Sequence, residues 1–184
     1  MSIFVFGLLT DADVAWMARA GVQRPIKDRE ILVEEGRPLE SVIFLLQGEY
    51  MVTEHAAGEI AWLGVGEVVG EMSFLDSAPP SATVTAIGDG LALFLDKEAL
   101  ARRLEADVAF GCRFYRALAI FLADRMRGTV RRMGGGAPEL DPKTVAKDEL
   151  DSRILGVVSM ARDRFDRLLK MLVGERRRAE PPES

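Results

Sequence analysis

Short apolar runs separated by glycine constrain the fold of this chain most strongly. They begin at residues 31, 41, 49, 60, 82 and 91, with glycine, proline or charged residues between them. Strands this short and this evenly spaced are typical of a sandwich or a barrel. The glycines between them, where turns need positive φ or a close approach of the chain, are Gly36, Gly48, Gly58, Gly66, Gly88 and Gly90. The pattern therefore predicts a mainly β domain.

Helical patterns flank this β region. Thr10, with Asp13 three residues later, resembles a capping box and predicts a short helix that ends near Gly21. Asp96 is the expected N-cap of a second short helix. Bulky apolar residues then follow at helical spacing and predict a long helix over residues 108–133.

The long helix carries an apolar stripe at steps of three and four residues. The stripe consists of Phe110, Phe114, Leu118, Phe121, Leu122 and Met126. Two interpretations remain open, because the stripe can pack on its own β domain or can also pair with a second copy of the chain.

Beyond the long helix, the sequence predicts a Gly-rich linker at 134–140, an amphipathic C-terminal helix at 141–174 and a disordered tail at 175–184. Asp141 and Pro142 form the start signal of that helix. Its apolar side consists of Leu150, Ile154, Val157, Ala161, Phe165, Leu168 and Leu172. This side must be buried, either within one chain or across a dimer.

Composition argues against an enzyme. The 184 residues contain one cysteine, Cys112, and one histidine, His55, so neither an internal disulfide nor a multi-thiolate or multi-histidine metal site can form. A nucleophile with a nearby base, or a carboxylate dyad, is also not recognisable. We therefore predict no catalytic residue, no metal and no required cofactor.

Charge and hydropathy narrow the range of partners. Residues 1–110 carry 18 acidic and 8 basic side chains, a net charge of −10, whereas the whole chain carries −5. An acidic domain is a poor surface for nucleic acid. No basic residue precedes the apolar start, and no apolar stretch reaches the length of a membrane span. We expect a cytoplasmic protein without a membrane partner.

The stretch 70–84, GEMSFLDSAPPSATV, concentrates the chemistry of the chain. It predicts one helical turn that follows a strand, then a loop and a further strand. The first turn of a helix has unpaired backbone N–H groups, and such groups suit a phosphate.

The order of these elements resembles the cyclic nucleotide-binding domain of the catabolite activator protein superfamily, over roughly residues 10–133. The markers are EEG at 34–36, the glycine of LLQGEY at 45–50, LGVGEVVGEMSFL from 63 and PPSATV at 79–84. The resemblance implies a double-stranded β-helix, also called a β-roll or jelly roll. The full expectation is a β-roll with an N-terminal helix over 1–107, followed by the long helix and the extra C-terminal helix.

In that family the 70–84 stretch is similar to the phosphate-binding cassette. The resemblance implies a ligand site made by Gly70, Glu71, Met72, Ser73, Pro80, Ser81, Ala82 and Thr83. Glu71 is the expected acceptor for a ribose 2′-hydroxyl, and backbone N–H groups around Ser73 are expected to face the phosphate. The alternative for Glu71 is purely structural, because a carboxylate near helix N-terminal N–H groups stabilises the turn without a ligand.

One departure from the family pattern concerns the ligand. Pro80 stands where the family has a phosphate-binding arginine, and proline offers neither a guanidinium nor an N–H. Losing one charge-assisted hydrogen bond, about 1.5 to 3 kcal/mol, lowers affinity about 10-fold to 150-fold. Binding of cAMP or cGMP is therefore expected to be weakened, lost or supported by an arginine from elsewhere.

A second departure concerns the output. Family members that regulate transcription have a winged helix-turn-helix after the long helix, and no such pattern is recognisable in the remaining residues. The resemblance implies a homodimer through 108–133. The leading hypothesis is a non-enzymatic sensor that signals through its C-terminal helices, to which a protein partner can dock. The alternative is a structural or adaptor protein with a degenerate ligand site, and a DNA-binding regulator ranks below both.

Overall fold

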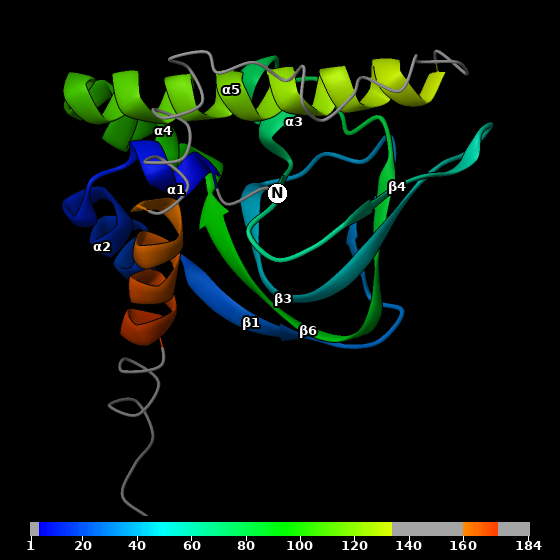
Figure 1. Ribbon diagram of the computed structural model, residues 1–184, viewed down its shortest axis with the longest axis horizontal. Coiled ribbons are helices and arrows are strands. Elements are labelled where there is room, and N and C mark those ends of the chain that lie inside the picture. The colour runs from blue at the N-terminus through cyan, green and yellow to red at the C-terminus, as the bar shows by residue number, and fades with distance from the viewer. Residues whose placement is uncertain (1–3, 134–159, 173–184) are drawn as a thin grey trace, which may run out of the picture.

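The computed structural model describes residues 4–133 and 160–172, and its centre is a six-stranded antiparallel sheet rolled on itself (Figure 1). The strands are β1 Val22–Ile26, β2 Ile31–Val33, β3 Ser41–Glu54, β4 Gly58–Leu63, β5 Val68–Val69 and β6 Thr83–Asp96. The helices are α1 Phe4–Leu8, α2 Asp11–Ala20, α3 Glu71–Leu75, α4 Lys97–Ala106 and α5 Val108–Met133. The predicted fold class, a β-roll with flanking helices, is confirmed.

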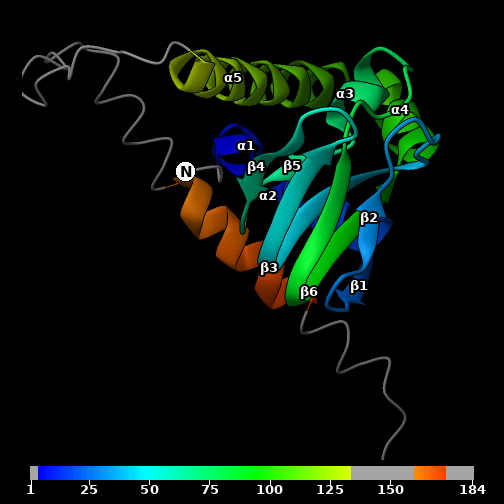
Figure 2. The same cartoon turned by 90° about the vertical axis from the view of Figure 1, so that its right-hand side faces the viewer.

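Two long strands organise the sheet. β6 pairs with both β1 and β3, and β3 pairs with β4, so the order is β1-β6-β3-β4. β2 joins β6, and β5 joins β3. Figure 2 shows the curvature that lets both strands contribute to the two sides of the roll.

The prediction of turns at Gly48, Gly88 and Gly90 is wrong. The runs at 41 and 49 form one strand, β3, and the runs at 82 and 91 form one strand, β6. The pairing register of β3 and β6 shifts on both sides of Gln47. A Cβ on Gly90 would lie 2.6 Å from the Tyr50 hydroxyl, so glycine there serves a close approach inside the sheet. Gly36 and Gly66 lie between strands, and Gly58 is the first residue of β4; all three have positive φ, as do Gly48 and Gly88 inside the long strands.

The predicted N-terminal caps of the two short helices are confirmed. The capping box of Thr10 and Asp13 opens α2, and the Asp96 side chain accepts a hydrogen bond from the Ala99 N–H at the start of α4. α1 was not predicted, because its apolar sequence has no cap or amphipathic period.

The apolar stripe of the long helix packs on its own chain. Phe110, Phe114, Leu118 and Phe121 are at most 4% exposed, whereas Met126 is 70% exposed. They belong to a core between the helices and one face of the roll, and a second core fills the roll itself. The hypothesis that this stripe also forms a dimer contact therefore fails for these four buried residues.

The described part of the C-terminal region is a helix over residues 160–172. Ala161, Phe165, Leu168 and Leu172 are buried against the same chain, as their spacing predicts. The other predicted parts, including the 134–140 linker, the start of the C-terminal helix and the 175–184 tail, lie outside the described residues. No helix within 4–133 or 160–172 is long and apolar enough to cross a membrane.

A buried ion pair fixes α5 to α2. Asp13, 2% exposed, accepts hydrogen bonds from Arg113 Nε at 2.8 Å and Arg113 Nη2 at 2.9 Å, and from the Thr10 N–H at 2.7 Å. Burial raises the pKa of Asp13, but the hydrogen bonds from Arg113 and Thr10 outweigh it and hold that pKa below the usual 3.8.

Replacing Asp13 with asparagine is expected to lower the free energy of unfolding by about 2 kcal/mol at pH 7. Because the folded-state pKa is depressed, the stabilisation is present above pH 3.8 and is lost as the pH falls through the folded value. Urea unfolding of both chains should thus converge only at pH values below the depressed folded-state pKa of Asp13, which lies under 3.8. The control, Glu98→Gln in an exposed pair, should change stability by less than about 0.5 kcal/mol. A loss independent of pH would contradict the electrostatic account.

Candidate functional site

Gly70 sets the geometry of the first half of the candidate site. It is the N-cap of α3 with φ +80°, a conformation that favours glycine. A Cβ would also lie 2.5 Å from Leu39 Cδ2 and 2.8 Å from the Ser41 carbonyl oxygen. Only glycine lets the chain turn from β5 into α3 at this distance from β3.

Met72 and Ser73 follow in the first turn of α3, where backbone N–H groups have no partner within the helix. The Met72 side chain is exposed, and the Ser73 hydroxyl accepts a hydrogen bond from Lys97 Nζ at 2.9 Å. Burial, opposed by the carboxylates of Glu40 and Asp76, lowers the pKa of Lys97. A cation thus lies beside the turn that is expected to hold a phosphate.

The second half of the site is fixed by the turn at 34–36. The Gly36 N–H donates to the Pro80 carbonyl oxygen at 2.8 Å, and the Glu35 N–H donates to Thr83 Oγ1 at 3.1 Å. The EEG marker is therefore a clamp on the loop that carries Pro80. Ser81 is exposed and Ala82 is half-buried at the start of β6.

Glu71 is the charged centre of the site. Its side chain is 2% exposed, and its Oε1 accepts a hydrogen bond from Arg125 Nη1 of α5 at 2.6 Å. Arg125 Nη2 also donates to the Val68 carbonyl oxygen at 3.1 Å, and the guanidinium lies 4.6 Å from the centre of the Phe121 ring. The carboxylate that the resemblance assigns to a ribose is thus joined to the long helix.

Burial and the charge of Arg125 act in opposite directions on the pKa of Glu71. Desolvation raises its pKa above the usual 4.5, and the charge of Arg125 opposes that rise. A carboxylate can accept about four hydrogen bonds, so Glu71 can keep Arg125 and still accept a hydroxyl.

A model of the cyclic nucleotide-binding domain matches residues 23–107, which span all the predicted site residues. Over these residues the chain is similar to the cyclic nucleotide-binding domain family. A comparison with curated proteins found no match.

Solved structures agree on this fold. A cyclic nucleotide-binding domain from Methylobacillus flagellatus KT is 25% identical with a TM-score of 0.65, covering 72% of this chain and 78% of that one. The catabolite activator protein of Thermus thermophilus is 20% identical with a TM-score of 0.60, covering 94% and 87%. The regulatory subunit of a cAMP-independent protein kinase A from Trypanosoma brucei is 19% identical with a TM-score of 0.52, covering 70% and 41%. The last two show the fold alone.

The eight predicted residues of the cyclic nucleotide-binding domain form two groups, 70–73 and 80–83. Within the described part of the chain, no hydrogen bond joins one group directly to the other, and each is held by different neighbours. No cluster of potential metal ligands occurs among the described residues.

Sequence reasoning missed Arg125 and Lys97. The signal for Arg125 was a basic residue four positions after Phe121, next to the apolar stripe of a helix that must cover the roll. Its carboxylate partner lies 54 residues away in sequence, so only the tertiary structure identifies the pair.

Replacing Arg125 with glutamine is expected to destabilise the domain by about 2 kcal/mol at pH 7.5, because a buried carboxylate loses its counter-charge. The raised pKa of Glu71 should rise further, so the variant is favoured at low pH and loses stability as the pH increases through that pKa. Urea unfolding should give a smaller loss at pH 5 than at pH 7.5.

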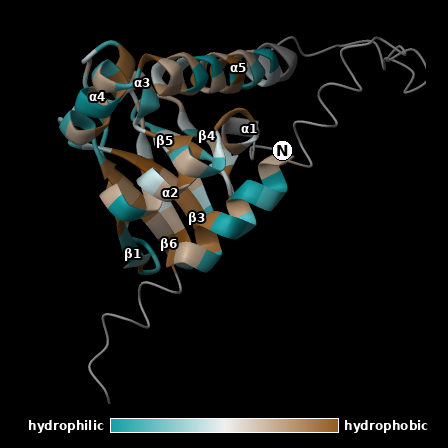
Figure 3. Cartoon of the chain, turned by 90° about the vertical axis from the view of Figure 1, so that its left-hand side faces the viewer, coloured by the Kyte–Doolittle hydropathy of each residue, from teal (hydrophilic) through white to brown (hydrophobic). Residues whose placement is uncertain are grey.

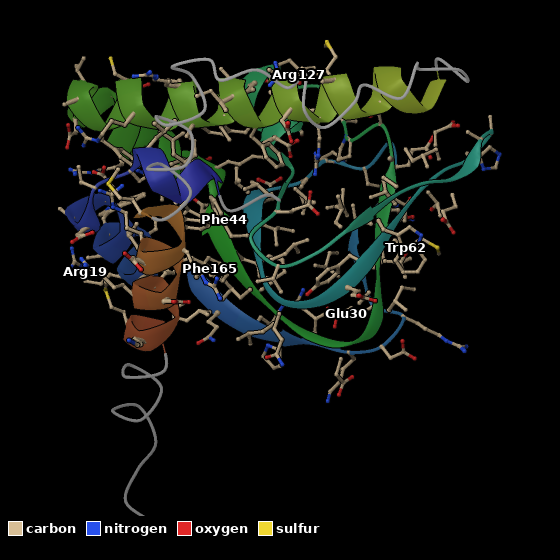
Figure 4. The ribbon with its side chains drawn as sticks, viewed as in Figure 1. Arg19, Glu30, Phe44, Trp62, Arg127 and Phe165 are labelled. Carbon is tan, nitrogen blue, oxygen red and sulfur yellow. The ribbon has the colours of Figure 1, made fainter. Side chains whose placement is uncertain are left out.

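Arg127→Gln is the matched control, since Arg127 is exposed on the same helix (Figure 4). An Arg125→Gln loss as small as that of Arg127→Gln, or one equal at both pH values, would contradict a charge role for the pair.

Proposed function

We propose that this chain is a non-enzymatic regulatory protein that binds a cyclic nucleotide in the cassette formed by 70–73 and 80–83, and signals through α5. The observation that carries the proposal is the hydrogen bond between Glu71 and Arg125. A ligand that engages the Glu71 carboxylate changes the electrostatic environment of Arg125. The position of α5 then depends on whether the site is occupied.

The hydrogen-bonding and charged groups at the candidate site indicate which class of ligand to test. Backbone N–H groups of α3 offer hydrogen bonds to a phosphate, and Glu71 offers an acceptor to a sugar hydroxyl. Lys97 and Arg125 are the cations nearest these groups in the described contacts. cAMP and cGMP combine a cyclic phosphate with a ribose 2′-hydroxyl, so they are the first ligands to test.

Replacing Pro80 with arginine is expected to raise affinity for cAMP or cGMP about 10-fold to 150-fold, because a guanidinium adds about 1.5 to 3 kcal/mol of charge-assisted hydrogen bonding to the phosphate. Isothermal titration of the native chain and the variant at millimolar nucleotide measures this change.

Pro79→Arg is the matched control, since it adds the same charge one position earlier on an exposed residue. Equal gains in both variants would indicate general electrostatic attraction. No gain in Pro80→Arg would mean that more than the missing arginine blocks the site, and it would favour the adaptor hypothesis.

The adaptor hypothesis has its own support in the structure. Glu71 already has a partner inside the protein, and Pro80 lacks the expected cation. A roll stabilised in this way needs no ligand to keep its turn. The absence of any heat with either nucleotide, together with a folded chain, selects this second function.

The outer face of α5 supports a homodimer. Exposed or half-buried residues recur there at steps of four and three, the heptad spacing of a coiled-coil seam. They are Val108, Cys112, Tyr115, Ala119, Leu122 and Met126. Most of this seam lies on the side of the helix away from the roll, whereas Leu122 at its edge also packs against the core of its own chain. A second copy can pack on the exposed part of the seam.

A parallel dimer in register brings the two Cys112 thiols together across the seam. Mild oxidation with diamide should convert them to one disulfide, with two electrons and two protons passing to diamide, and give a covalent dimer on a non-reducing gel. Met126→Glu should suppress this product, whereas Arg127→Glu, one residue off the seam, should not. Monomers in sedimentation with no rapid cross-linking would contradict the dimer.

A further inference from the structure

The helix at 160–172 packs on a surface that α1 and the start of α2 build. Phe165 lies 5.3 Å from the Phe6 ring, and Phe6 lies 5.8 Å from Phe44 of β3. Figure 4 shows Phe44 and Phe165 pointing into this shared region. Phe6 is fully buried, so the docked helix completes the apolar cover over α1.

Two arginines add hydrogen bonds and ion pairs beside this apolar contact. Arg164 Nη1 donates to the carbonyl oxygens of Gly7 at 2.7 Å and Phe6 at 3.4 Å, near the end of α1, and its Nε donates to Asp11 at 3.3 Å. Arg167 pairs with the other carboxylate oxygen of Asp11. Carbonyls at a helix C-terminus lack intrahelical partners and attract cations. The surface therefore favours an amphipathic helix that carries basic residues next to its apolar side.

The contact is one that can open separately from the roll. Residues 160–172 are amphipathic, and a helix of this kind gains most of its stability from the apolar surface on which it packs. Only one side is buried, and hydrophilic residues are visible on the rest (Figure 3).

We propose that the surface around Phe6, Gly7 and Asp11 is a docking site for an amphipathic helix with basic residues beside its apolar side, and that residues 160–172 of the same chain are its detachable occupant. Release of the segment exposes both an apolar surface and an apolar helix. A partner protein with a helix of this chemistry competes for the same place.

A fluorescein-labelled peptide of residues 160–172 tests the proposal on the full chain. In the variant Phe165→Asp with Leu168→Asp, the internal helix cannot dock, so the peptide should bind at least tenfold more tightly than to the native chain, whose site is occupied. Adding Asp11→Asn to that variant should weaken binding about fivefold, because two partly exposed ion pairs are lost. The same variant with Glu98→Gln instead should bind unchanged.

Hydrogen exchange of the native chain gives a second readout that needs no variant. Backbone amides of 160–172 should exchange at least tenfold faster than those of β3, because local release precedes global unfolding. Exchange as slow as in β3 would make the helix a permanent part of the core and overturn the proposal. Failure of the peptide to bind a double variant with a native circular dichroism spectrum would overturn it as well. Neither readout involves a nucleotide, so both are independent of the proposed ligand.

Discussion

Two buried carboxylates hold the long helix on the β-roll, and the rest of the molecule depends on that attachment. Asp13 binds Arg113 and Glu71 binds Arg125, so α5 is fixed at points about 18 Å apart along its axis. Phe114, Leu118 and Phe121 fill the space between these points. An apolar helix face alone tolerates sliding or rotation, whereas two charge pairs with buried carboxylates specify one position. The exposed seam of α5 is the other side of the helix that these pairs orient.

The two ion pairs differ in the pKa of the carboxylate and in the number of hydrogen bonds that it accepts. Asp13 has a depressed pKa and accepts three hydrogen bonds from Arg113 and Thr10, which makes it a structural anchor. Glu71 has a raised pKa, lies at the first residue of the α3 turn, and receives one guanidinium from outside the cassette. The same carboxylate therefore supports the turn and faces the chemistry expected of a ligand site. Under the proposed function, a ligand at Glu71 acts on the same carboxylate that Arg125 holds.

Local signals in the sequence predicted local structure well and long-range pairs poorly. Thr10 and Asp13 form their capping box within one helical turn, so the pattern is readable, but the second role of Asp13 needs Arg113, 100 residues away. Glycine was ambiguous for a similar reason. A turn and a close approach of two strands both require it, and only the contact with Tyr50 shows that Gly90 serves the second purpose. The cassette turn at Gly70 was predictable because its geometry is local, whereas its cationic neighbours come from α4 and α5.

α1, the element that the sequence did not predict, has more than one neighbour. It packs against α5 on one side and against the 160–172 helix on the other, as the views in Figures 1 and 2 both show. It is five residues long and has no cap signal of its own, so these neighbours rather than its propensity determine its position. A short helix held in this way follows a shift of either neighbour. Because α5 is tied to Glu71 through Arg125, the candidate site and the helix at 160–172 are separated by only two packed contacts, α5 on α1 and α1 on residues 160–172.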